Sequence, residues 1–595
     1  MNTIEQTLVT HISQGFKEIF GKTLENISLQ ETKKEFEGTH TFVVFPFTKE
    51  LAKKPVEIAE AIGSYLLANC PIVEKYNAVQ GFLNISLKDE VWLQFFEEIY
   101  TKKQFQLSKR NEKVVVEYSS PNTNKPLHLG HLRNNFLGYS VAKILEACGY
   151  EVHKTQIIND RGIHICKSML AYEKFGNGET PESSGIKGDH LVGRYYVEFD
   201  KLYKKQIEEL KAQGYSPEEA EKQAPAIQEA QKMLVDWENG NEKVIVLWKK
   251  MNKWVLDGFN ETYQKIGVAF DSTYYESDTY LLGKDIVEEG LSKGIFYKKP
   301  DGSVWIDLTD EGLDNKLVLR SDGTSVYITQ DLGTAELRYK DHKMQKMIYV
   351  VGNEQDYHFK VLFLILKKLG RSYADGLHHL SYGMVELPSG KMKSREGTVV
   401  DADELVEEVI QVAKEKTIEK MQSAGTYEGF NETEQAKLFE MIGLGALKYF
   451  LLKIDPQKKM LYNPAESVSF EGDAAPFIQY THARICSVLR KGRESTQIEW
   501  RGKYTHLHLL ERNLIYLLGN YLNVLQLAAE RYAPYLVAQY AYELSKTYSS
   551  FYAECSILKA ESNEAKSFRL ALSDLVAQTI REAMAVLGIK VPERM

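Results

Sequence analysis

The sequence predicts an α/β protein built around a parallel sheet, with a small α+β unit before it and a bundle of helices after it. Apolar residues 114–116 indicate a strand, residues 132–148 a helix, and a second apolar run ending at Ile158 another strand. A strand, helix and strand of this length form a right-handed parallel crossover, so the core is expected to be Rossmann-like. From about residue 474 onward the apolar residues follow the helical period and no strand pattern occurs.

The chain divides into three expected domains, because 595 residues exceed what one hydrophobic core usually serves. Residues 1–108 contain both helical and β-rich stretches and end in a polar linker, which indicates an α+β domain. Residues 109–473 hold the parallel-sheet core, interrupted by a charged, aromatic helical insertion at about residues 167–265. Residues 474–595 are expected to fold as an α-helical bundle.

Further strands of the core are expected where short apolar or β-branched runs end in polar residues. These runs lie at residues 302–308, 317–320, 325–331, 346–352 and 380–387. Helices are expected from Thr334 onward and over residues 359–369. Ligands of such sheets bind outside the carboxyl ends of the strands, so polar residues just after a strand are candidate ligands.

The composition excludes several classes of protein. A formal net charge of -8 argues against a protein whose whole surface binds nucleic acid, but it does not exclude a local basic groove. The five cysteines form no C-x-x-C pair, so we expect neither a disulfide framework nor a zinc site. No signal peptide and no run of about 18 apolar residues occurs, so we expect a cytoplasmic protein without a membrane partner.

The loop after the first core strand carries the strongest candidate site. His128, Gly130 and His131 lie where the following helix begins, and Lys125 precedes them. A helix N-terminus offers free N–H groups and a positive dipole end, which suit a phosphate. Two histidines at this spacing also commonly cap or pack a helix, and the pair alone does not decide between these readings.

A second candidate loop, residues 389–397, follows the expected strand at 380–387. It is bracketed by glycines and carries Lys391, Lys393 and Arg395. Alone, such a loop is typical of a solvated turn. If both loops lie at one sheet edge, they would bracket a polyphosphate from two sides. The sequence contains no G-x-x-x-x-G-K-[ST] loop, which argues against a P-loop nucleotide hydrolase.

Together these motifs resemble the class I aminoacyl-tRNA synthetases. His128-Leu129-Gly130-His131 is similar to the family's HIGH signature, and residues 391–395, Lys-Met-Lys-Ser-Arg, are similar to its KMSKS loop. The match is closest to the arginyl-tRNA synthetases and covers the whole chain. It extends to residues 117–122 (EYSSPN), 325–335 (SVYITQDLGTA), 351–355 (VGNEQ) and 470–473 (FEGD).

The resemblance implies a class I synthetase fold and a two-step reaction. In the first step the carboxylate of arginine attacks the α-phosphate of ATP, and in the second the activated arginine passes to the 3′ end of tRNA(Arg). Mg²⁺ is expected to accompany ATP. The implied catalytic residues are His128, His131, Lys125, Lys391, Lys393 and Arg395. The implied ATP-binding residues are His128, Leu129, Gly130, His131, Lys391, Met392, Lys393 and Ser394. No metal ligand is assigned to the protein, and a monomer is expected.

One position departs from the family pattern. The KMSKS signature has lysine at its fourth position, whereas this chain has Ser394. Arginyl members often vary here, and a lysine just before the HIGH motif is thought to compensate. Lys125 occupies that place, so the resemblance implies a catalytic role for it.

An arginine pocket needs carboxylates that accept paired bonds from a planar guanidinium, with amide and hydroxyl groups to complete the set. Glu117 and Asp331 each lie near the end of an expected strand. The alternative for Asp331 is the N-cap of the helix from Thr334. The resemblance implies that the arginine-binding residues are Glu117, Ser119, Asn122, Tyr327, Asp331 and Gln355.

Rival functions remain at this point. The zinc-binding cysteines usual in methionyl and cysteinyl members are missing, and the insertion is smaller than the editing domains of leucyl, isoleucyl and valyl members. A nucleotidyl-transferring enzyme of the same fold without tRNA is disfavoured by the long helical C-terminus, which resembles an anticodon-binding domain. A non-enzymatic tRNA-binding relative is favoured only by Ser394. The N-terminal unit resembles the family domain that contacts the outer corner of tRNA.

Overall fold

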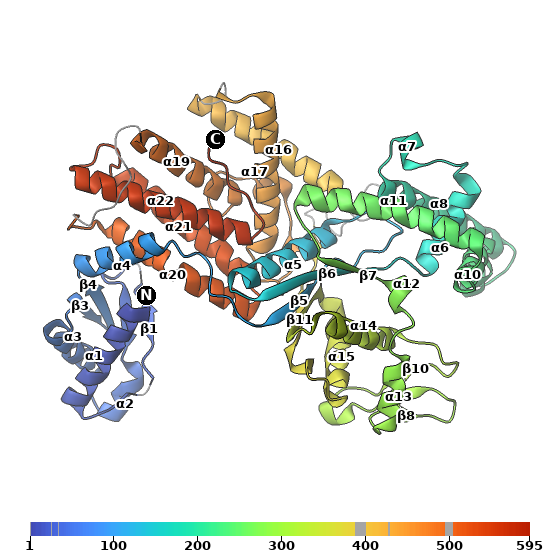
Figure 1. The fold of residues 1–595 in the computed structure, drawn as a ribbon, viewed down its shortest axis with the longest axis horizontal. Coiled ribbons are helices and arrows are strands. Elements are labelled where there is room, and N and C mark those ends of the chain that lie inside the picture. The colour runs from blue at the N-terminus through green and yellow to red at the C-terminus, as the bar shows by residue number, and fades with distance from the viewer. Residues whose placement is uncertain (1, 25, 34, 387–399, 426–428, 494–503) are drawn as a thin grey trace.

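The computed structural model describes residues 2–24, 26–33, 35–386, 400–425, 429–493 and 504–595. A five-stranded parallel sheet lies at the centre, in the order β12-β11-β5-β6-β7. The N-terminal unit lies at one side of it, the helical insertion at the other, and the C-terminal helices pack over it (Figure 1). In the described part of the chain, no helix is long and apolar enough to cross a membrane.

The N-terminal unit is an antiparallel four-stranded sheet, in the order β1-β2-β4-β3, covered by helices. Apolar residues such as Phe16, Ile62 and Trp92 are fully buried, and their hydrophobic cluster is continuous with that of the C-terminal helices. Its elements are α1 (Asn2–Phe20), β1 (Leu29–Glu31), β2 (His40–Val43), η1 (Phe45–Phe47), α2 (Thr48–Leu51), α3 (Pro55–Asn69), β3 (Val73–Val79), β4 (Phe82–Leu87) and α4 (Asp89–Lys102).

The central sheet is buried on both faces because its strands alternate side chains between two cores. Val114 and Val116 face the core that contains α5, whereas Val115 faces the core that contains α14 and α15. The strands are β5 (Lys113–Glu117), β6 (Glu151–Ile158), β7 (Ser272–Tyr275), β11 (Lys346–Gly352) and β12 (Leu377–Tyr382). Their helices are α5 (Leu129–Ala147), α6 (Ile163–Phe175), α14 (Tyr327–His342), η3 (Asn353–Gln355), α15 (Asp356–Lys368) and η4 (Ala374–Gly376).

Two groups of elements interrupt the sheet between β6 and β11. The first is the helical insertion, in which the long helices α8 and α11 pack side by side (Figure 1). Its elements are α7 (Pro181–Ser184), α8 (Gly188–Ala212), α9 (Pro217–Gln223), α10 (Pro225–Glu238) and α11 (Glu242–Ile266). The second surrounds a small antiparallel sheet and consists of α12 (Glu276–Thr279), α13 (Lys284–Ser292), β8 (Tyr297–Lys298), β9 (Val304–Ile306), η2 (Thr309–Glu311) and β10 (Lys316–Leu319).

After β12 the chain leaves the central sheet and becomes helical. Arg133 on α5 fixes this crossing, because its guanidinium donates to the carbonyl oxygens of Gly383 (2.6 Å), Pro456 (3.0 Å) and Lys458 (2.9 Å). The elements are β13 (Val385–Glu386), α16 (Ala402–Ala424), α17 (Glu432–Leu452), β14 (Met460–Leu461), α18 (Pro464–Ser467), α19 (Ala475–Arg493), α20 (Leu509–Arg531), α21 (Pro534–Glu554) and α22 (Asn563–Val586).

The expected strands at 114–116 and 346–352 are confirmed, but two other expectations are wrong. Residues 325–331 are not a strand, because α14 begins at Tyr327. The hydroxyl of Thr329 accepts from the N–H of Val326 (3.1 Å) and caps the helix, so β-branched residues here serve a helix start. The run at 380–387 is split, because β13 pairs with β14 instead of joining the central sheet.

Candidate active site

The loop between β5 and α5 brings both histidines to the start of α5. His128 is the N-cap residue, and its Nδ1 accepts a hydrogen bond from the N–H of Gly130 (3.1 Å). The Nδ1 of His131 accepts in turn from the N–H of His128 (3.2 Å), and the two ring centroids lie 3.8 Å apart. Since both Nδ1 atoms are acceptors, a neutral ring carries its proton on Nε2, which remains as a donor.

Both histidines are held neutral. The pKa of His128 is lowered to about 4 by burial and by the charge of Lys125, against an opposing effect of Asp401. The pKa of His131 is lowered well below its usual value, mainly by burial. Capping and ligand binding are therefore compatible, because Nδ1 serves the helix, whereas Nε2–H has no hydrogen-bond partner among the described residues and can donate to a phosphate.

The lowered pKa predicts how acid destabilises the fold. The unfolded chain protonates His128 near its ordinary pKa of about 6.5, whereas the folded chain resists until about 4. The neutral His128 therefore contributes fully to the stability of the fold above pH 6.5. As the pH falls from 6.5 to about 4, the free energy of unfolding decreases by about 3 kcal/mol. We expect the melting temperature to fall more steeply with acid in the wild type than in His128→Asn, which keeps a cap. Parallel curves for the two proteins would contradict the assigned shift.

Gly130 gives His128 the room it needs. A Cβ at this position would lie 2.9 Å from Cε1 of His128. Any larger residue would push the ring out of its capping position, and it would also cover the backbone of the first helical turn. The glycine therefore leaves both the histidine and the helix start open to a ligand.

Lys125 is half-buried on the same loop. Burial lowers its pKa, and within the described residues no carboxylate forms an ion pair with it. A partly desolvated ammonium without a protein partner is suited to an anionic ligand. The charge of Lys125 acts on both His128 and His131, so the three side chains share one region.

The basic loop at residues 391–395 lies outside the residues that the structure describes, but both of its flanks are attached to α5. Before it, the turn at Gly383 is held by Arg133. After it, the carbonyl of Val400 accepts from the N–H of Leu129 (3.1 Å), and the N–H of Ala402 donates to the carbonyl of Leu127 (2.9 Å). The chain thus enters and leaves this segment beside the helix that carries the histidines.

The two candidate carboxylates lie near the same end of the sheet. Glu117 ends β5, is 5% exposed and forms an ion pair with the buried guanidinium of Arg338 on α14. Burial raises the pKa of Glu117, and the negative charge of Asp331 adds to this effect. Asp331 is more accessible, and its Oδ2 bonds Nε2 of His358 on α15 (2.6 Å). Asp331 lies inside α14, so the alternative that it caps this helix is wrong.

The other expected pocket residues differ in accessibility. Tyr327, the first residue of α14, is 78% exposed, and Gln355 in η3 is also exposed. Asn122 pairs through its backbone with Asn159 at the end of β6. Ser119 is 1% exposed, donates its N–H to Asn134 (2.7 Å) and bonds the hydroxyl of Tyr263 (2.7 Å). Its N–H and its hydroxyl are thus both engaged within the protein, which holds the loop after β5 in place.

Two partners at this site were missing from the sequence prediction. Arg338 and His358 hold Glu117 and Asp331 respectively. Arg338 lies seven residues, or two helical turns, after Asp331. If residues 327–342 had been identified as a helix, Asp331 and Arg338 would have been placed on the same helix face. His358 follows β11 on a different helix, and no local pattern links it to Asp331.

Comparison with known proteins identifies the family. Residues 96–462 match the family model "tRNA synthetases class I (R), catalytic domain". Residues 6–87 match "Arginyl tRNA synthetase N terminal domain", and residues 478–595 match "DALR anticodon binding domain".

Full-length relatives give the same result. The chain is 56% identical to the arginine–tRNA ligases of Amoebophilus asiaticus and of Flavobacterium psychrophilum, with 100% of both chains covered in each case. The solved Thermus thermophilus arginyl-tRNA synthetase superposes with a TM-score of 0.79 at 25% identity, covering 99% of this chain and 100% of that one. The class I synthetase fold expected from the motifs is thus confirmed, and the chain belongs to the arginyl-tRNA synthetases, a family of aminoacyl-tRNA ligases.

Proposed function

We propose that this chain joins L-arginine to tRNA(Arg) with ATP as co-substrate. In the first step a carboxylate oxygen of arginine bonds to the α-phosphorus of ATP, and the bond to the departing pyrophosphate breaks. In the second step a hydroxyl of the terminal adenosine of tRNA takes the arginyl group and AMP leaves. The observation that carries this proposal is the shared sheet edge, which has phosphate donors at α5 and carboxylates at β5 and α14.

On the ATP side, we assign His128 and His131 to hydrogen bonds from Nε2–H to the phosphates. Leu129 and Gly130 would lie against the nucleotide, because the glycine leaves the backbone open. Lys125 would stabilise the charge that grows on the phosphates during the transfer. Neutral histidine donors combined with one cation suit a reaction that needs positioning and charge stabilisation more than a covalent nucleophile.

Further cations for the departing pyrophosphate are proposed on the loop outside the described residues. They are Lys391, Lys393 and Arg395, and Met392 and Ser394 would complete the ATP contacts. The attachment of both flanks to α5 supports this proposal. Mg²⁺ would arrive with ATP and neutralise part of the phosphate charge, and we assign no protein ligand to it.

On the arginine side, we assign Asp331 as the accessible carboxylate for the guanidinium and Glu117 as the inner carboxylate held by Arg338. Tyr327 and Gln355 would complete the side-chain pocket, and Asn122 would bind the α-amino end. Such a pocket would reject neutral amino acids because they leave Asp331 without the guanidinium that it is proposed to bind.

The tRNA partner is proposed to contact the outer domains. We keep the boundaries 1–108, 109–473 and 474–595, which the matches to N-terminal and anticodon-binding family models support. The bundle of α19 to α22 would bind the anticodon, and the N-terminal unit the outer corner of tRNA. We further propose that the protein acts as a monomer in the cytoplasm.

Amino-acid-dependent exchange of pyrophosphate into ATP tests this proposal. The assay is run with each of the standard amino acids, with and without tRNA(Arg). We expect arginine to be the one amino acid of this panel that supports exchange. The exchange should be faster when tRNA(Arg) is present. Exchange without any amino acid, or with lysine above arginine, would contradict the proposal. Arginine-dependent exchange in an enzyme that never charges tRNA would favour a nucleotidyl-transferring enzyme of the same fold.

A further inference from the structure

The helical insertion contacts the loop that carries Lys125. Gly193 in the second turn of α8 packs against this loop, and a Cβ there would lie 2.8 Å from Cδ of Pro126 and 3.6 Å from Cα of Lys125. The start of α8 is also packed tightly on α11, because a Cβ at Gly188 would lie 2.1 Å from the carbonyl oxygen of Trp254. The insertion therefore presents a fixed helix start to the active-site loop.

The same helix start also reaches the segment that lies beside the HLGH motif. Nε2 of His190 on α8 hydrogen-bonds Oδ2 of Asp401 (2.8 Å). The other oxygen of Asp401 caps α16, accepting from the N–H groups of Asp403 (2.8 Å) and Glu404 (3.1 Å). Both oxygens of Asp401 are thus engaged, and His190 fixes the one that faces the insertion.

Asp401 lies directly opposite His128. The two residues form an antiparallel bridge, flanked by hydrogen bonds from Leu129 to Val400 and from Ala402 to Leu127. The charge of Asp401 also reaches the His128 imidazole and opposes the lowering of its pKa. A displacement of Asp401 would therefore move the backbone that sets the capping geometry of His128 and remove a charge that acts on its ring.

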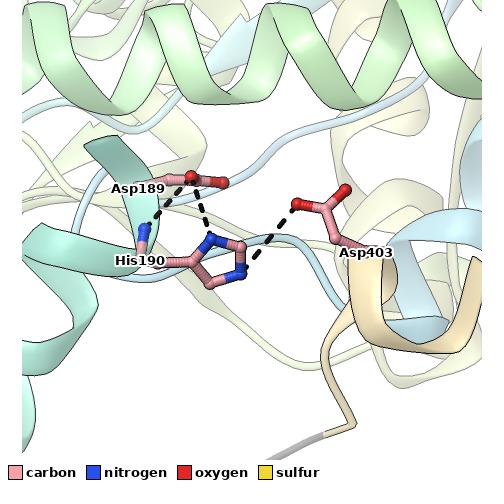
Figure 2. Close-up of side chains that lie close together, drawn as sticks. All are labelled: Asp189, His190 and Asp403. Atoms are coloured by element: carbon pink, nitrogen blue, oxygen red, sulfur yellow. Dashed lines mark hydrogen bonds and ion pairs between the residues drawn. The ribbon is translucent and has the colours of Figure 1, made fainter. Parts of the chain in front are cut away.

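The surroundings of His190 show a network that is complete without a bound ion. Asp189, His190 and Asp403 come from α8 and α16 and offer ligand atoms within 4.8 Å of one another (Figure 2). The ammonium of Lys187 already contacts Asp189 (3.1 Å), Asp403 (2.6 Å) and the hydroxyl of Thr262 (2.6 Å). The chain supplies its own cation here, so the cluster is better explained as a clamp between α8, α11 and α16 than as a metal centre.

We propose that His190 is a positioning residue for the ATP half of the reaction, acting through Asp401 on His128. This inference rests on the proposed function and gives the helical insertion a role in it. Among the described residues, the contacts of the His190 ring are with Asp189, Asp401 and Asp403, none of which is assigned to bind arginine. The binding of arginine should therefore be unaffected when the His190–Asp401 bond is lost.

The test uses the full-length enzyme in arginine-dependent pyrophosphate exchange, with KM for ATP and for arginine measured separately. In His190→Ala we expect kcat/KM for ATP to fall by about 10-fold, the effect of losing one hydrogen bond to a charged group, while KM for arginine stays within about 2-fold. In His190→Gln an amide donor can replace Nε2–H, and most of the loss should be restored. Tyr203→Phe, which removes one hydrogen bond elsewhere on α8, is the matched control and should behave as the wild type.

Other outcomes overturn the inference. Equal losses for ATP and arginine in His190→Ala, or no rescue by glutamine, would indicate a merely structural side chain. Combining His190→Ala with Asp401→Asn should cost little more than Asp401→Asn alone, and additive losses would exclude action through Asp401. A metal-dependent rise in the melting temperature that His190→Ala abolishes would show a metal centre instead. If the wild type shows no arginine-dependent exchange, the proposed function itself fails.

Discussion

Replacing Asp331 by alanine is expected to raise the KM for arginine by about 100-fold or more, because a guanidinium would be left without its accessible carboxylate. The pocket would retain Glu117, whose charge is already engaged by Arg338. The KM for ATP should change little, since the proposed phosphate donors lie at and before the start of α5. Steady-state exchange kinetics with arginine and ATP varied separately measure both values.

A matched control is available on the same helix. Asp341 on α14 accepts a hydrogen bond from the hydroxyl of Tyr274 (2.9 Å) and is not assigned to the pocket. Asp341→Ala therefore removes a carboxylate and one hydrogen bond from α14 without removing a proposed ligand. If Asp331→Ala binds arginine as well as this control does, the pocket has been placed wrongly.

Replacing Lys125 by methionine is expected to lower kcat for exchange by about 100-fold, with little change in KM for arginine. Methionine keeps much of the length and apolar character of the side chain but removes the ammonium. The effect should be large because Ser394 stands where the family signature has a lysine, so fewer cations remain to stabilise the phosphate charge. Presteady-state formation of the adenylate separates this effect from product release.

Lys143→Met provides the comparison for Lys125→Met. Lys143 lies on α5 too, but it pairs with Glu146 (2.6 Å) near the far end of the helix. Its replacement should leave kcat unchanged. Nearly normal kcat in Lys125→Met would show that the loop cations supply the charge without it, and Lys125 would then lose its assigned role.

Features carried by local pattern could be predicted from the sequence. The strand at 114–116 is a short buried run followed by a loop and a periodic helix, and the structure confirms β5 and α5 there. The HLGH motif lies at the helix start because its own histidines cap that start. In these cases the forces that set the structure act between residues close in sequence, so their signal survives in a single chain.

Features that depend on distant partners could not be predicted. Asp331 was expected at a strand end because Val326 and Ile328 are β-branched. In the structure both pack into the second hydrophobic core, and the cap by Thr329 favours a helix. Ser119 belongs to the EYSSPN motif, yet it is buried and forms hydrogen bonds with Asn134 and Tyr263. In each case tertiary contacts override the local preference.

The helical insertion shows the same limit on a larger scale. Its helical character follows from its periodicity, but its contact with the active site depends on His190 and Asp401, which are 211 residues apart. A histidine next to an aspartate in a charged helical region is typical of a solvated face. Only the fold shows that this histidine lies beside the start of α5.

Charging of tRNA(Arg) with labelled amino acids tests the central claim most directly. The purified chain is incubated with ATP, Mg²⁺ and tRNA(Arg), and the label that becomes attached to the 3′ end of tRNA is measured for arginine and for lysine. The proposed function predicts arginyl-tRNA that depends on ATP, with lysine at background. Lysyl-tRNA at comparable levels, or adenylate formation with no transfer to tRNA, would contradict it.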